Sequence, residues 1–273
     1  MSINPSVLWG FIGIVIGAGS KFFFDHLLAH RLLRRKEIKS VVRQYSRPVL
    51  RSGESLERRI NNFILNHKRH WFENDEYYRL STLYQFGCFL GWVLRLEYEV
   101  VFLEFENLKA SREFNIRLNT VFKAFTGFEY FEGIDDFEAK DASTIPRLVL
   151  TAIGELMIAG SAQDKNVSLV GFTTFVKNYK TDSQYKKWFG HLTSFLSNLK
   201  VSSRDLRWDR LILIGATLRR LIWFLDPNST CTRSRQICNI DLIQNPCVRL
   251  SLLKETLASR CPNRYKKELR NML

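Results

Sequence analysis

The feature that most constrains this chain is an apolar stretch close to its N-terminus. Residues 3–24 contain one charged side chain, Lys21, and residues 7–20 contain none. A helix needs about 20 mostly apolar residues to cross the bilayer core, and the 22 positions of this stretch would span roughly 33 Å. The pattern therefore predicts a membrane-spanning helix within residues 1–24, with the Lys21 amine extended toward the headgroups.

Small residues recur through the predicted span at steps of four and three, which places them on one face of a helix. Membrane helices associate where such a strip lets two backbones approach closely, and Gly13 with Gly17 forms a GxxxG pair. The strip predicts a helix-association surface and a homo-oligomer, although glycine is also common in membrane helices that do not associate. Its members are Ser6, Gly10, Gly13, Gly17 and Ser20.

Basic residues follow the span on one side only, and we expect them to contact anionic lipid headgroups of the bilayer. The positive-inside rule places this side in the cytoplasm and the short N-terminus outside. The predicted lipid contacts are Lys21, Arg31, Arg34, Arg35, Lys36 and Lys39. A cleaved signal peptide is the alternative, because residues 18–20 resemble a small-residue cleavage site.

Residues 25–48 continue the helical pattern and combine an apolar stripe with several arginines. The pattern is typical of a basic amphipathic stalk, whose stripe packs either at the bilayer surface or on the rest of the protein. Because proline disfavours helix at the residue before it, we expect the stalk to end at Arg47–Pro48. Residues 49–273 then form a cytoplasmic helical domain, with 127–144 as a candidate joint.

The net charge of +14 is distributed as a basic, an acidic and a second basic region. Residues 21–70 carry a net charge of +9, residues 71–160 carry −7, and residues 161–273 carry +12. Basic surface beside a bilayer suits anionic lipid. It also suits nucleic acid, but no zinc finger or RRM signature supports that reading, so nucleic acid is not the expected partner.

Two stretches predict helices inside the folded core. Residues 80–94 carry no charge, but fifteen residues are short for a membrane span, so a core helix is favoured over a second crossing. Gly87 and Gly91 within them predict a close crossing with a neighbouring helix. A helix at about 204–225 has a broad apolar face edged by arginines, which also indicates a core position.

Weaker patterns predict the remaining helices. We expect them at about 52–71, 166–180 and 183–200, and after the turn at 143–146 up to Gly160. In that turn Ser143 is the predicted capping residue and Pro146 lies in the first turn. No β-alternation longer than four residues occurs.

Residues 127–144 are rich in acidic and aromatic side chains and are expected to form a loop. Their acidic part, 129–141, is a candidate surface for a protein partner. Asp135 and Asp136 are adjacent carboxylates, which acid–base catalysis often uses. Nothing close in the sequence supplies a nucleophile or a phosphate-binding loop, so no catalytic residues are predicted.

Candidate metal ligands are few. His67, His70 and Glu73 have a spacing that a metal site can use, but no fourth ligand is near, and a solvated helix end is favoured. The C-terminal cysteines lack the short spacing of a zinc knuckle, and in the cytoplasm we expect them to be reduced and metal-free. They are Cys231, Cys238, Cys247 and Cys261. The sequence predicts no metal and no cofactor.

These patterns together predict an all-α protein: one N-terminal membrane helix, a basic stalk and a cytoplasmic multi-helix domain. Glycine-rich phosphate loops, G-x-S-x-G, H-E-x-x-H and kinase signatures are absent from the sequence. The favoured function is a membrane-anchored, non-enzymatic scaffold, sensor or signalling effector that self-associates, with an oligomeric pore-former as a sharper variant. A membrane-tethered enzyme with an unrecognised site and a tethered nucleic-acid binder are the alternatives.

Overall fold

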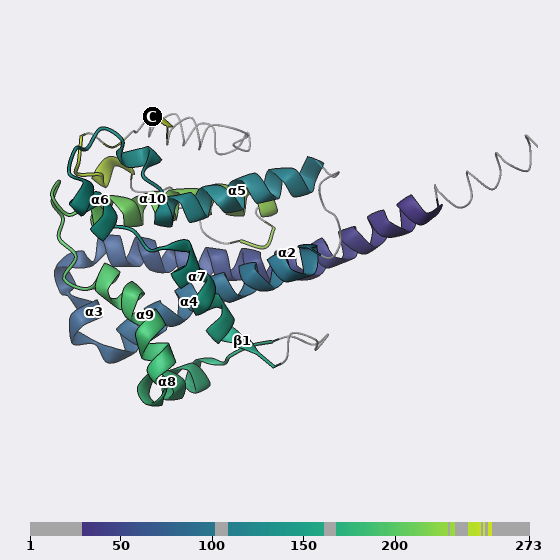
Figure 1. The fold of residues 1–273 in the computed structure, drawn as a ribbon, viewed down its shortest axis with the longest axis horizontal. Helices are drawn as coiled ribbons and strands as arrows, with labels where there is room; N and C mark the ends of the chain where they lie inside the picture. The colour runs from purple at the N-terminus through teal and green to yellow at the C-terminus, as the bar shows by residue number, and fades with distance from the viewer. Residues whose placement is uncertain are drawn as a thin grey trace, which may run out of the picture.

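The part of the chain that the structure describes is almost entirely helical, which confirms the all-α prediction at that level (Figure 1). The structure is a computed structural model that describes residues 29–101, 109–160, 168–228, 230–232, 240–246, 248 and 251–252. Within these ranges, the description covers the backbone alone at residues 29–45, 99–101 and 109–111.

Five helices form the main bundle of the described chain. They are α2 (Ala29–Leu65), α4 (Glu76–Val101), α5 (Lys109–Thr126), α7 (Arg147–Met157) and α10 (Leu206–Leu225). Helix α4 packs against α2 and α7, while α10 packs against α2 and α5, and a smaller contact between α5 and α7 closes the ring. Helix α4 is therefore the element shared by the two most extensive helix pairs, α2–α4 and α4–α7.

Shorter elements connect and flank this bundle. The connecting elements are η2 (His67–Arg69), α3 (Trp71–Asn74), η4 (Glu129–Phe131), α6 (Phe137–Ala142), β1 (Ile158–Ala159), β2 (Ser168–Leu169) and η5 (Ile240–Leu242). Helices α8 (Phe172–Thr181) and α9 (Ser183–Leu196) pack together and against α4 and α7. The observed α8, α9 and α10 confirm three of the predicted helices. The helix predicted from 166 is wrong at its start, because Ser168–Leu169 form β2 and α8 begins at Phe172.

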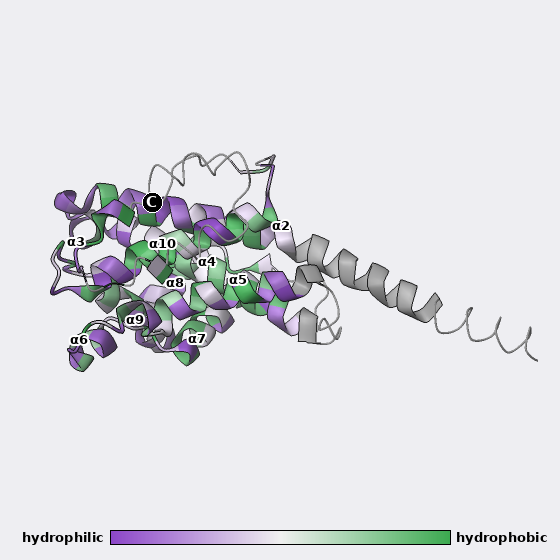
Figure 2. Ribbon diagram, turned by 90° about the horizontal axis from the view of Figure 1, so that it is seen from above, coloured by the Kyte–Doolittle hydropathy of each residue, from purple (hydrophilic) through white to green (hydrophobic). Residues whose placement is uncertain are grey.

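The core lies around α4 and α10, where hydrophobic residues gather in the middle of the bundle (Figure 2). Of the 20 residues of α10, 16 are buried, which confirms its predicted core position. The sequence predicted arginines at the edges of one apolar face, but Arg210 and Arg219 are buried as well. Helix α4 buries the uncharged stretch 80–94 in the same core, which confirms the core-helix reading of that stretch. Within the described part of the chain, no helix combines the length and the apolarity that a bilayer crossing requires.

Gly87 and Gly91 allow α4 and α7 to cross at close range, as the sequence predicted. A Cβ atom on Gly87 would lie 2.9 Å from Met157 Sδ, and one on Gly91 would lie 3.0 Å from Met157 Cβ. Gly154 of α7 faces α4 in return, because a Cβ there would lie 3.0 Å from the carbonyl oxygen of Leu90. A side chain at Gly154 would meet the backbone of α4 and push the two helices apart, whereas one at Gly87 would first displace the Met157 side chain.

Helix α2 does not end at Arg47–Pro48, so the predicted end of the stalk helix is wrong. The helix continues through Pro48 to Leu65, where it stops short of the predicted end at Trp71. Proline costs a helix interior about 3 kcal/mol because it removes one hydrogen bond and crowds the preceding turn. The buried side chains that follow Pro48 hold the helix against α4 and α10 and outweigh that cost; they are Val49, Leu50, Leu56 and Ile60.

Two predicted details of the 143–160 region are also wrong. Ser143 does not cap α7, because Pro146 occupies the N-cap position and no side chain supplies a cap hydrogen bond there. Helix α7 ends at Met157 instead of Gly160, and the next two residues pair with β2 in a short antiparallel ribbon, Ile158 opposite Leu169 and Ala159 opposite Ser168. Strands of two residues are too short to produce an alternating sequence pattern.

The bundle has two distinct ends along its long axis. At one end the N-terminal part of α2 projects beyond the other helices, and at the opposite end lie α6 and the segment that joins α9 to α10 (Figure 1). The 37 residues of α2 would extend about 55 Å as a straight helix. The buried C-terminal half of α2 thus fixes the direction of its projecting half.

Candidate functional site

A cleft in the described part of the chain lies at the end of the bundle opposite the projecting half of α2, between α6, α9 and the start of α10. Its volume is about 720 Å³. The lining side chains are Ala139, Ala142, Ser143, Thr144, His191, Ser194, Phe195, Lys200, Ser202, Arg204, Asp205, Leu206 and Arg207. The cleft therefore combines a small apolar wall with hydroxyl groups and several cationic side chains.

The segment 197–205, which forms one wall, is held at both of its ends. Near its start, Asn198 adopts a left-handed backbone conformation with φ of 51°, and its N–H donates to Glu73 Oε1 at 2.9 Å. At its end, Asp205 caps α10 by accepting from the N–H of Arg207. A capping aspartate also suits the positive end of the helix dipole.

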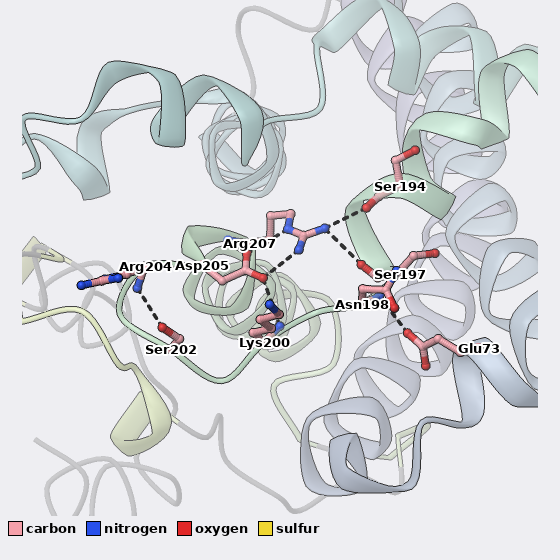
Figure 3. Close-up of polar contacts among 9 residues, drawn as sticks. All are labelled: Glu73, Ser194, Ser197, Asn198, Lys200, Ser202, Arg204, Asp205 and Arg207. Atoms are coloured by element: carbon pink, nitrogen blue, oxygen red, sulfur yellow. Dashed lines mark hydrogen bonds and ion pairs between the residues drawn. The ribbon is translucent and has the colours of Figure 1, made fainter.

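Asp205 and Arg207 form an ion pair in which almost all of their side-chain hydrogen-bonding groups are engaged (Figure 3). We call this pair the brace. Arg207 donates to Asp205 through Nε at 2.8 Å and through Nη2 at 2.7 Å, and its Nη1 donates to the carbonyls of Ser194 and Ser197. The second Asp205 oxygen also accepts from the N–H of Lys200 at 3.0 Å. This brace ties the cleft wall to the C-terminus of α9.

The brace also keeps Asp205 ionised. Burial acts to raise the pKa of Asp205, but the hydrogen bonds from Arg207 and from the Lys200 N–H hold it below its ordinary value. The only carboxylate among the lining residues is thus a charged group that is already fully engaged with its own neighbours.

Lys200 and Arg204 differ from Arg207 in exposure and in hydrogen-bond partners. Both line the cleft and are exposed, and neither side chain makes a hydrogen bond or ion pair with the residues that the structure describes. Arg204 extends away from the Asp205–Arg207 pair (Figure 3). The cleft lining therefore carries three cationic side chains against one carboxylate, a formal excess of +2 before His191 is counted.

A buried arginine lies directly behind the cleft wall. Arg210 Nε donates to Ser143 Oγ at 3.1 Å, and its Nη1 donates to the carbonyls of Ala124 and Gly127. The guanidinium carbon also lies 4.6 Å from the centre of the Phe131 ring. Burial lowers the pKa of Arg210 to about 9. These contacts attach α6 and η4 to α10, and so they position the α6 wall of the cleft.

The structure brings together few of the residues that the sequence singled out. The predicted span, with Ser6, Gly10, Gly13, Gly17, Ser20 and Lys21, lies outside the described residues. The other predicted lipid contacts lie on the projecting part of α2, where only the backbone is described; they are Arg31, Arg34, Arg35, Lys36 and Lys39. The acidic segment 129–141 forms η4 and α6, and Phe137 in it is 63% exposed.

The residues considered as metal ligands do not form a site in the described part of the chain, where no three His, Cys, Asp or Glu residues group together. His67 Nδ1 contacts the carbonyl oxygen of Ile64, while Glu73 accepts from Asn198. Cys88 and Cys231 are free thiols, and the other C-terminal cysteines lie outside the described residues.

Sequence reasoning missed the cleft. Two of its three cations, Lys200 and Arg204, belong to a run in which serines separate the basic residues ahead of a capped helix. That run is a visible signal, but the apolar wall comes from α6 and α9, which only the folded chain places beside it.

Comparisons with known proteins give no further guide to this site. No family model matches the chain, and neither the curated proteins nor the solved structures include a match to it.

Proposed function

We propose that the protein is a membrane-anchored, non-enzymatic interaction protein whose helical domain is carried on a rigid arm. The observation that supports this proposal is the continuity of α2, which runs from Ala29 to Leu65 as one helix and is built into the core over its second half. A helix of this kind transmits position and orientation from the apolar N-terminal segment to the rest of the domain.

The arm is also basic where it leaves the bundle. Its projecting half contains five of the six predicted lipid contacts, from Arg31 to Lys39. Each basic side chain near an anionic bilayer surface contributes about 1 kcal/mol of attraction. Basic residues on the arm would hold the bundle close to an anionic cytoplasmic leaflet, with the C-terminal domain in the cytoplasm.

Two reporters fused to the C-terminus test this topology. A cytoplasm-only fluorescent protein should be active, and an enzyme active only outside the cytoplasm should be inactive. The membrane fraction should retain the full chain after washing in alkaline carbonate. Activity of the second reporter would reverse the orientation, while release by carbonate would remove the anchor.

Self-association through the glycine strip is the finer part of the proposal. Replacing Gly13 and Gly17 together by Ile keeps the span apolar but adds side chains to the face where two backbones would meet. Cross-linking in native membranes should give dimers or larger species for the parent chain and mostly monomer for the variant.

The matched control replaces Ile12 and Ile16 by Leu, which changes the neighbouring face and preserves hydrophobicity. This control should cross-link like the parent. If the glycine variant also cross-links like the parent, the strip is ordinary membrane composition, and the pore-forming variant of the proposal loses its support.

A further inference from the structure

We propose that the cleft between α6, α9 and the start of α10 binds a small organic phosphate, with the phosphate held by Lys200 and Arg204. Phosphate binding is a role additional to membrane anchoring, and it does not require the protein to be anchored. The proposal rests on the shape of the cleft, on the partners of its charged side chains and on its place in the fold.

The charge of the cleft matches a phosphate monoester. Such a group carries a charge of about −1.5 to −2 at neutral pH and offers strong acceptor oxygens. The lining has a formal excess of +2, and its only carboxylate, Asp205, is already engaged by Arg207 and by the Lys200 N–H. The side chains of Lys200 and Arg204, which make no hydrogen bond or ion pair with the described residues, supply charge-assisted donors that the fold leaves unused.

Hydroxyl groups add donors on the same surface. Ser202 Oγ accepts from the N–H of Arg204 at 3.2 Å and keeps its own proton to donate, and Ser194 also lines the cleft. The carboxylates of Glu138 and Asp141 on α6 are not among the lining residues, although Ala139 and Ala142 beside them are. The acidic side chains of α6 therefore stay outside the space that a phosphate would occupy.

The remaining part of the cleft suits an apolar or ring-shaped body. Ala139, Ala142, Phe195 and Leu206 provide its apolar lining. A volume of about 720 Å³ is more than a bare phosphate needs and lies within the range of roughly 300–1,000 Å³ that is typical of small-molecule sites. The cleft is therefore better matched to a phosphorylated compound than to inorganic phosphate.

The place of the cleft favours a soluble ligand over a lipid headgroup. The cleft and the projecting half of α2 lie at opposite ends of the long axis (Figure 1). If the arm leads to the bilayer, as the proposed function holds, the cleft faces away from it. The preference for a soluble ligand over a lipid headgroup rests on the proposed function, whereas the binding of a phosphate group does not.

Isothermal titration calorimetry on the full chain in phosphatidylcholine nanodiscs tests the inference, with phenyl phosphate, inorganic phosphate and phenol as probes. Phenyl phosphate should bind most tightly, inorganic phosphate more weakly, and phenol without detectable heat. Replacing Lys200 and Arg204 together by Ala should weaken phenyl phosphate binding by roughly tenfold or more, because two charge-assisted contacts are lost.

The matched control replaces Lys177 and Lys186 by Ala, which removes the same charge from exposed positions outside the cleft. Its binding should stay within about twofold of the parent. Equal losses in the two variants, or no binding of phenyl phosphate to the parent, would overturn the proposal. Displacement of phenyl phosphate by phosphatidic acid added to the nanodiscs would overturn the choice of a soluble source and would leave the anchoring proposal intact.

Discussion

The two buried arginines of α10 are stabilised in opposite ways. Arg219 forms an ion pair with Glu57 of α2, and both side chains are almost fully buried, at 2% and 0% exposure. Arg210 is equally buried, but its hydrogen bonds go to neutral acceptors, two carbonyls at the end of α5 and the Ser143 hydroxyl, and its guanidinium lies over the Phe131 ring. Helix α10 therefore stabilises Arg219 by an ion pair with α2, and Arg210, behind the cleft, by neutral hydrogen-bond acceptors.

The different partners of Arg219 and Arg210 reflect the different structural roles of the two ends of α10. On α2, Asn61 donates to Glu57 at 2.7 Å and so orients the carboxylate. The ion pair between Glu57 and Arg219 then connects α2 to α10 and fixes how α2 lies on the core. Burial raises the pKa of Glu57, against the opposite effect of Arg219. Behind the cleft, the C-terminal carbonyls of α5 suit a cation. Among the described residues Arg210 forms no ion pair, although the charge of Glu129 acts to raise its pKa. Lys200 and Arg204 in the cleft lining likewise pair with no carboxylate among the described residues.

The largest effect should come from breaking the charge pair. Replacing Arg219 by Met leaves Glu57 buried in the core without its cation, and one-sided loss of a buried pair costs about 3–5 kcal/mol. Urea unfolding followed by circular dichroism should show the free energy of unfolding lowered by that amount. The double variant Glu57→Leu/Arg219→Met should recover most of the loss, because well-packed apolar residues replace such pairs nearly neutrally. A double variant as unstable as Arg219→Met would show that the unpaired Glu57 is not the cause of the lost stability.

A smaller effect should follow from replacing Arg210 by Met. The change removes donors to Ser143, Ala124 and Gly127 but also removes the cost of burying a charge, so we expect a loss of about 2–3 kcal/mol. The loss should be local, and limited proteolysis should cut within 127–144 faster than in the parent. Unchanged cleavage there would contradict the role given to Arg210 in attaching α6 and η4.

The pH dependence separates two aspartates at the start of α10. Asp209 accepts from the N–H groups of Gln244 and Asn245, and burial raises its pKa from 3.8 to about 6. The folded state therefore holds this proton where the unfolded state has lost it, and the contribution of Asp209 to stability is lost as the pH rises from about 4 through 6. The stability advantage of the parent over Asp209→Asn should fall by on the order of 2–3 kcal/mol across this window.

Asp205 provides the opposite control. Its pKa is lowered in the folded state, so its contribution is present above the ordinary value and is lost as the pH falls through the folded pKa. The advantage of the parent over Asp205→Asn should therefore grow with rising pH. The same sign for both aspartates in urea unfolding at several pH values would contradict this account.

The smallest effect should come from the cleft cations. Replacing Lys200 and Arg204 by Ala should change the free energy of unfolding by no more than about 0.5 kcal/mol, because both side chains are exposed and pair with none of the described residues. Thermal unfolding of parent and variant should give nearly equal midpoints. A loss comparable to that of Arg210→Met would mean that these cations serve the fold and are not reserved for a ligand.

The sequence anticipated those parts of the fold that depend on local pattern. The apolar faces of α4 and α10 gave their core positions, and the glycines of α4 gave the crossing with α7. The path through Pro48 could not be predicted, because side chains on α4 and α10 stabilise that turn from outside the local sequence. The cleft was missed for the same reason, since Ala139 and Lys200 meet only through tertiary packing.

The central claim is that the molecule has a membrane end and a cleft end. Photolabelling the full chain in bilayers whose lipids carry a diazirine in the acyl chain tests it without any substitution. Mass spectrometry of the digested protein should find labels in peptides from residues 3–24 and none in peptides from 183–207. Labels in 183–207, or a lack of labels in 3–24, would contradict the account.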